Sequence, residues 1–296
     1  MRIDAPHVPP LKASFGRRAI ISTLRALPLG QDLALRAYRK VARHLWCVTF
    51  GLTYFGGTME CDLSDFIPEC IYHFGVWEPH ISAAIQGLLH KGETFCDVGA
   101  NIGYHSLLAS SLVGTEGHVI AVEPSPAIVA RLQKNLGLNS SSNVRVVPAA
   151  AHSERGTISI YQVSKFNTGM TTTIASQGAA KVCDVTCLPL SEILTDEERS
   201  RLGIIKIDVE GAEPAILREI LDHLDIYPQH FHIVVEMSET PENIDLFERF
   251  LQSGFTASAI QNSYDLVRGY LELRSISAPL PMSAPPTSKQ DVLFSR

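Results

Sequence analysis

The chain has 296 residues, of which 45% are hydrophobic, 7% aromatic and 19% charged. This length suits one large domain with an appended element, and the composition excludes a disordered or fibrous chain. The formal net charge is −6, but the first 50 residues carry nine Lys or Arg against two Asp, and the remainder carries 16 basic against 29 acidic residues. The acidic remainder excludes broad nucleic-acid binding, because phosphate contacts need clustered cations.

The cysteines and the N-terminus indicate the compartment. The six cysteines, at positions 47, 61, 70, 96, 183 and 187, form no CxxC pair. In a chain of this size they are typical of free thiols in a reducing compartment. No secretory signal is visible at the N-terminus, and no segment reaches the roughly 18 uninterrupted apolar residues of a membrane span. We therefore expect a cytoplasmic protein.

Residues 17–46 have a helical pattern that is interrupted near Pro28-Leu29-Gly30. The second part repeats basic residues at helical spacing, namely Arg36, Arg39, Lys40 and Arg43. We expect residues 1–60 to form a basic N-terminal helical extension and residues 61–296 to form the main domain. Such a helix packs on the domain, contacts an anionic membrane surface, or targets an organelle, and the sequence leaves these alternatives open.

From residue 94 onward, short apolar runs alternate with helical stretches. The predicted strands are residues 94–98, 118–122, 144–147, 157–162, 204–208, 232–237 and 291–295. The predicted helices are residues 104–112, 126–136, 213–224 and 242–252. This alternation predicts an α/β fold with a parallel sheet and helices on both faces. Ligands bind such sheets beyond the carboxyl ends of the strands. Residues 167–170, after the 157–162 strand, form either an active-site loop or a plain turn.

A glycine loop follows the first predicted strand, in the segment Asp97-Val98-Gly99-Ala100-Asn101-Ile102-Gly103. The glycines let the backbone turn tightly and approach a ligand, and the next helix begins with free N–H groups. Asp97 suits a cationic amine rather than a pyrophosphate. Glu123 ends the second strand, 20 residues beyond Gly103, where a carboxylate accepts hydrogen bonds from ribose hydroxyls. Together they predict a site for a nucleoside joined to an amino acid, such as S-adenosylmethionine.

A third cluster ends the strand predicted at residues 204–208. Strand alternation places Lys206 and Asp208 on one face. A lysine within an apolar strand is costly to bury unpaired, so a carboxylate neighbour is expected. Glu210 and Glu213 begin the next helix, where acidic residues also serve as caps.

Five blocks of the sequence resemble the FkbM family of S-adenosylmethionine-dependent methyltransferases. They are residues 74–79 (FGVWEP), 94–103 (TFCDVGANIG), 119–124 (VIAVEP), 135–139 (NLGLN) and 205–213 (IKIDVEGAE). His105 departs from the aromatic or small residue that is more common in the family. The resemblance implies a class I methyltransferase Rossmann-like sheet, mostly parallel with an antiparallel last strand. It also implies methyl transfer, typically to an oxygen, with S-adenosyl-L-methionine as cofactor.

The candidate site residues follow from this resemblance and from the strand ends. The cofactor-binding candidates are Glu78, Asp97, Gly99, Ala100, Asn101, Gly103, Tyr104, Ser106, Glu123, Pro124, Ser125 and Ala150. The catalytic candidates are Asp208, Lys206, Glu210 and His105. A hydroxyl is too weak an acid to ionise alone at neutral pH, so a base or a metal is expected.

We assign the base to Asp208, with Lys206 orienting it or holding the acceptor, and His105 as a second candidate. A divalent metal shared by Asp208, Glu210 and another carboxylate is the alternative, and no metal site is predicted.

Two other function classes stay open. A nicotinamide-dependent oxidoreductase is disfavoured by Asp97 and by the spacing of Gly99 and Gly103. A methyltransferase-like protein that binds without catalysis is disfavoured by the intact acidic residues. The expected partners are a small-molecule or glycan acceptor, a membrane surface through the basic helix, and a second copy in a homodimer, with no nucleic acid.

Overall fold

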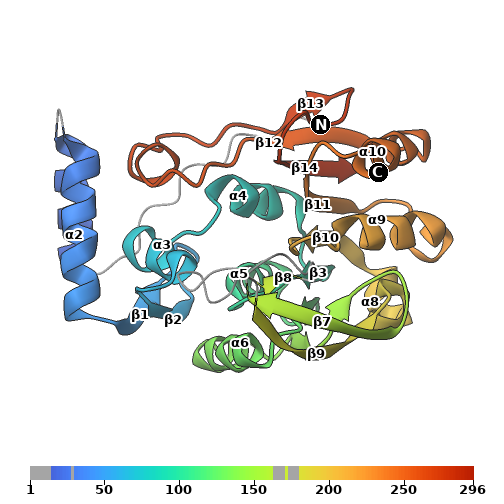
Figure 1. The fold of residues 1–296 in the computed structure, drawn as a ribbon, viewed down its shortest axis with the longest axis horizontal. Helices are drawn as coiled ribbons and strands as arrows, with labels where there is room; N and C mark the ends of the chain where they lie inside the picture. The colour runs from blue at the N-terminus through green and yellow to red at the C-terminus, as the bar shows by residue number, and fades with distance from the viewer. Residues whose placement is uncertain (1–14, 28–29, 163–170, 173–179) are drawn as a thin grey trace.

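The computed structural model describes residues 15–27, 30–162, 171–172 and 180–296. Its main element is an eight-stranded sheet (Figure 1). In spatial order the strands are β13 (Leu280–Met282), β12 (Thr256–Ile260), β14 (Gln290–Ser295), β11 (His232–Met237), β10 (Leu202–Ile207), β3 (Thr94–Val98), β4 (His118–Val122) and β5 (Val144–Val147). The strands from β11 to β5 are parallel, whereas β14 is antiparallel to both β11 and β12. This confirms the expected class I methyltransferase sheet. The short β13, which we did not predict, is also antiparallel.

The central strands are buried on both faces, which explains their near-continuous apolar sequences. Every residue of β3 and of β10 is buried. The bounds of β3, β4, β5 and β11 agree with the prediction. Strand β10 ends one residue earlier than predicted, so Asp208 is the first residue after it, and the Asp208 backbone N–H donates to the Val98 carbonyl at 3.0 Å.

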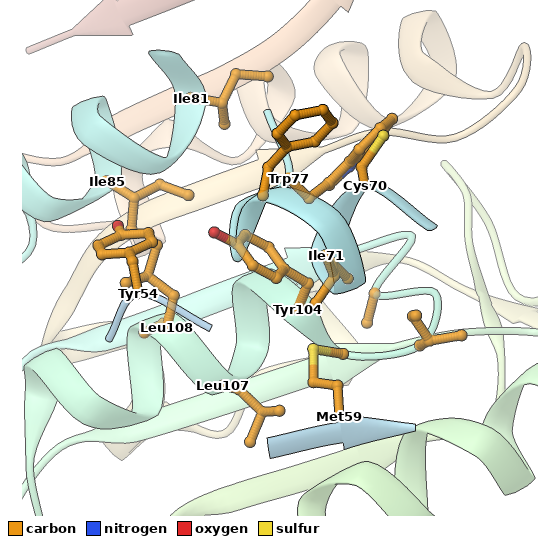
Figure 2. Packing of buried hydrophobic residues seen from close by; sticks show 14 of the residues in the cluster. Tyr54, Met59, Cys70, Ile71, Trp77, Ile81, Ile85, Tyr104, Leu107 and Leu108 are labelled. Carbon is orange, nitrogen blue, oxygen red and sulfur yellow. The ribbon is translucent and has the colours of Figure 1, made fainter. Parts of the chain in front are cut away.

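Helices cover both faces of the sheet, as predicted. Figure 1 shows α4 on one side of the strands and α9 on the other. The first side holds α3 (Phe66–Phe74), α4 (Pro79–Leu88), α5 (Tyr104–Val113) and α6 (Pro126–Leu138), and the second holds α7 (Leu190–Ile193), α9 (Glu213–Asp222) and α10 (Pro241–Gln252). Strand alternation divides the core accordingly: Phe95 belongs to the first cluster and Cys96 to the second. Figure 2 shows part of the first cluster, with Trp77 and Tyr104 among aliphatic side chains.

The smaller elements lie outside the large sheet. A second sheet has the order β6 (Ala150–Ala151), β9 (Ala180–Leu188), β7 (Gly156–Gln162) and β8 (Thr171–Thr172). Strand β7 confirms the strand predicted at residues 157–162, whereas residues 167–170 lie outside the described residues. Three short helices are α8 (Asp196–Ser200), the 3-10 helix at Leu224–Ile226 and the π-helix at Val267–Leu271. None of the described helices is long and apolar enough to cross a membrane.

The N-terminal segment is helical only in its first part. Helices α1 (Phe15–Ala26) and α2 (Gln31–Leu45) agree with the predicted break, but β1 (Val48–Leu52) and β2 (Thr58–Asp62) form an antiparallel hairpin that we did not predict. The hairpin is joined to α6, because Asn139 and Asn135 accept from the backbone N–H groups of Thr58 and Glu60 at 2.7 and 2.8 Å. This pairing gives a structural role to the NLGLN block. The domain boundary near residue 60 stays a prediction.

A close approach of two backbone segments requires a glycine at position 99. Its φ is +80°, and an added Cβ would lie 1.9 Å from the Asp208 carbonyl oxygen. We expected the missing side chain to serve ligand approach. The structure shows that it also lets the ends of β3 and β10 meet.

We predict that Gly99→Ala lowers the free energy of unfolding by roughly 3 kcal/mol, because left-handed strain and steric overlap add. Urea denaturation of purified protein measures this loss. The matched control is Gly137→Ala in α6, where an added Cβ meets nothing within 4 Å. We expect that change to be neutral or stabilising by about 0.5 kcal/mol. Equal stabilities of the two variants would contradict a structural requirement for glycine at position 99.

Candidate active site

A cavity of about 430 Å³ lies at the carboxyl ends of β3, β4, β10 and β11. This volume is within the range of small-molecule sites. The candidates that line it are Glu78, Gly99, Asn101, Glu123, Pro124, Ala150, Asp208 and Glu210. Their position follows from the fold, because neighbouring parallel strands bring their carboxyl ends to one edge of the sheet.

The other candidates do not contribute to the cavity lining. They are Asp97, Ala100, Gly103, Tyr104, His105, Ser106, Ser125 and Lys206, and all are buried. The Ser125 backbone N–H donates to the cavity-lining Glu123, whereas the Ser106 hydroxyl donates to Asp97, which is itself outside the lining. The structure thus separates the candidates into a lining set and a supporting set.

Glu123 is held by the glycine loop. Its Oε2 accepts from the Asn101 backbone N–H at 3.1 Å, and its Oε1 accepts from the Ser125 backbone N–H at 2.9 Å. Burial raises the pKa of Glu123 to about 7, although these two hydrogen bonds act against it. Each carboxylate oxygen has two lone pairs, so an ionised Glu123 still has acceptor capacity for ribose hydroxyls.

Lys206 is a buried cation among carboxylates. Its side chain is 3% exposed, and its Nζ donates to Asp208 Oδ2 at 2.9 Å. Lys206 also pairs in register with Asp97 of the neighbouring strand β3. Burial lowers the pKa of Lys206, but the nearby carboxylates, Asp208 first, outweigh it, so the pKa is raised overall. Lys206 therefore stays protonated and orients Asp208.

Asp97 balances the charge of Lys206 beneath the glycine loop. Its Oδ2 accepts from Ser106 Oγ at 2.6 Å, whereas its buried Oδ1 has no hydrogen-bond partner among the described residues. An unsatisfied buried carboxylate oxygen next to the cavity-lining residues Val98 and Gly99 fits the ammonium group of an amino-acid ligand.

Glu78 approaches the same cavity from the start of α4, with a left-handed φ of 45°. Its Oε1 accepts from the Tyr264 hydroxyl at 2.7 Å, and its Oε2 lies 3.7 Å from His105 Nε2. Burial, with Asp208 nearby, raises the pKa of Glu78 to about 8. Burial and then Lys206 hold the pKa of His105 well below its usual range, so this histidine is neutral. The geometry places His105 against Glu78 rather than against the cavity.

Several lining residues were missing from our prediction. Lys289 Nζ lies 2.6 Å from Glu236 Oε2 and 3.9 Å from Glu210 Oε2. Asp291 does not line the cavity but is paired in register with the lining residue Glu236. Burial, with Asp208 and Glu236 nearby, raises the pKa of Asp291 to about 7. Glu236 had a usable signal, since it is an acidic residue near the end of an apolar strand. Tyr264 and Lys289 had none, because they lie in irregular segments.

No metal-binding arrangement of three or more His, Cys, Asp and Glu side chains occurs within the described ranges. Three of the acidic residues lie near lysines: Asp208 is paired with Lys206, and Glu210 and Glu236 lie near Lys289.

Comparison with known proteins identifies the family. A sequence profile described as "Methyltransferase FkbM domain" matches residues 97–272, more than half of the chain. The methyltransferase sdnD of Sordaria araneosa is 28% identical over 153 residues, which cover 42% of this chain and 59% of that protein. Methyltransferase 1 of Beauveria bassiana (strain ARSEF 2860) is 25% identical over 189 residues, which cover 56% of this chain and 72% of that protein.

A solved structure of a methyltransferase FkbM from Methylobacillus flagellatus KT is 14% identical, with a TM-score of 0.42. The alignment covers 94% of this chain and 59% of that chain. The chain spans less than two thirds of the length of several curated relatives that it matches.

We predict that S-adenosylmethionine binds more tightly at about pH 8 than at about pH 6. Below its pKa of about 7, Glu123 is protonated, and one oxygen then donates instead of accepting. Linkage to one proton limits the effect to about tenfold per pH unit below that pKa. Calorimetric titration at the two pH values measures it. Glu123→Gln should bind more weakly and lose this part of the pH dependence, and an unchanged profile in that variant would exclude the ribose role.

Proposed function

The chain belongs to the FkbM methyltransferase family, and we propose that it methylates a hydroxyl oxygen of a small molecule, sugar or glycolipid. Its cofactor is S-adenosylmethionine. The observation that carries the proposal is the position of Asp208, which lines the cavity with 45% of its side chain exposed and is oriented by a buried lysine.

One part of the cavity suits the cofactor. Glu123 and Asn101 provide polar groups for a ribose. Asp97, which is buried beside the lining, has a carboxylate oxygen with no hydrogen-bond partner among the described residues, and this oxygen suits an ammonium group. The apolar side chains of Val122, Ala149, Ala150, Ala151 and Ile160 line the same region and suit a purine ring. When bound, S-adenosylmethionine supplies an electrophilic methyl group on a sulfonium.

The other part of the cavity suits an acceptor. Asp208, Glu210 and Glu236 provide hydrogen-bond acceptors, and Lys289 lies between the two glutamates. Asp208 would accept the proton of the acceptor hydroxyl. The oxygen of that hydroxyl would receive the methyl group as the bond between the methyl carbon and the sulfonium sulfur breaks, which leaves a neutral thioether. Lys206 is buried outside the cavity lining, which supports the orienting role rather than direct contact with the acceptor.

Family membership disfavours the nicotinamide alternative, and detection of a methylated product separates an active enzyme from a non-catalytic relative.

We also propose a cytoplasmic location. All six cysteines are free thiols in the structure, which supports this location.

We predict that Asp208→Asn lowers turnover by about 10²- to 10⁴-fold, because it removes the general base. The affinity for S-adenosylmethionine should change little, since Asp208 belongs to the acceptor part of the cavity. Transfer of labelled methyl groups to a panel of hydroxylated acceptors gives the turnover, and calorimetry gives the affinity. Asp222→Asn on the exposed face of α9 is the matched control. Full turnover in Asp208→Asn would exclude Asp208 as the general base.

A further inference from the structure

Exposed large apolar side chains are concentrated near the N-terminal end of the described chain. Twelve such side chains are found among the described residues, and six of them lie between positions 33 and 50. They are Leu33, Val41, Leu45, Trp46, Val48 and Phe50. We call this set the α2–β1 face. An exposed apolar patch of this kind typically marks a surface that contacts another molecule.

The α2–β1 face has two parts, a row on α2 and one face of β1. Leu33, Val41 and Leu45 are spaced by multiples of four along α2, so they form one row on the helix surface. Leu33 is 74% exposed. Val48 and Phe50 share the exposed face of β1, because they are two residues apart in a strand. Figure 1 shows α2 at one end of the molecule, with the β1–β2 hairpin at its foot.

The four basic residues of α2 divide into two pairs. Arg39 and Arg43 each donate two hydrogen bonds to the buried carboxylate of Glu69 in α3, at 2.5 to 3.1 Å. These two arginines therefore anchor the helix. Arg36 and Lys40 are exposed and lie one turn apart beside the apolar row, with Arg36 paired to the exposed Asp32. The outward surface of α2 thus combines an apolar row with exposed cations.

We propose that the α2–β1 face docks on an anionic lipid surface. A helix with apolar residues on one side and Lys or Arg beside them lies in the plane of the interface, with its apolar side chains at the acyl boundary. A tryptophan at the end of the helix suits the headgroup level. A second copy is a poorer occupant, because a two-fold dimer would bring Arg36 and Lys40 towards their own counterparts. Helix α3 joins the face to the cavity, since it carries Glu69 as well as the cavity-lining Phe66 and Ile67.

The test is sedimentation of the full chain with vesicles. We expect binding to phosphatidylcholine vesicles that contain about one third phosphatidylserine, and weaker binding to phosphatidylcholine alone or at high salt. The variant Leu33→Glu/Leu45→Glu should bind at least about tenfold more weakly, because it removes apolar contact and adds repulsion. Leu138→Glu/Val182→Glu is the control, with the same charge change at exposed apolar positions elsewhere. It should bind within about twofold of the unaltered chain.

Three results would overturn the proposal. The first is an unaltered chain that stays in the supernatant with anionic vesicles. The second is an equal loss in the control, which would indicate net charge alone. The third is a dimer, seen by sedimentation velocity, that Leu33→Glu/Leu45→Glu dissociates, which would assign the face to self-association. S-adenosylmethionine binding by each variant checks folding, and methyl transfer plays no part in the readout.

Discussion

The site depends on one buried positive charge, the Lys206 ammonium group in the middle of the sheet. An unpaired ammonium in such surroundings would cost several kcal/mol, so carboxylates must be close to it. Asp97 comes from β3, Asp208 follows β10, and Glu78 begins α4, so one charge brings together three separate elements. Removing any of these carboxylates would leave the lysine less well compensated, which links the stability of the sheet to the geometry of the cavity.

The cavity as a whole is acidic. Glu78, Asp208 and Glu210 line it together with Glu236, and Asp291 lies behind them, whereas the nearby cations are Lys206 and Lys289. Burial and mutual repulsion raise the pKa of Glu78 to about 8 and that of Asp291 to about 7. A cationic ligand would reverse part of this shift, because a nearby positive charge favours the ionised carboxylate. The electrostatics therefore favour a sulfonium cofactor over an anionic one.

The basic residues of α2 have two roles, since one pair anchors the helix and the other lies beside the exposed apolar row. The basic repeat of α2 predicts a charged surface, yet Arg39 and Arg43 are both paired with the buried carboxylate of Glu69. The cations beside the apolar row that are not paired with Glu69 are Arg36 and Lys40. The anchoring arginines hold α2 against α3, so the exposed face is presented on a fixed helix rather than on a loose arm.

The strands β3, β4, β5 and β11 could be predicted from the amino-acid sequence, together with the positions of Gly99, Glu123 and Asp208 at the strand ends. These signals are local, because an apolar run or a glycine turn is complete within a few residues. The hairpin, α3, α4 and β12 were not predicted, since their patterns are short or mixed. Two sets of contacts became visible only in the folded chain. Tyr264 donates to Glu78, 186 positions away, and Lys289 lies near Glu210 and Glu236. Such contacts depend on how distant segments pack, and no periodicity within either segment encodes them.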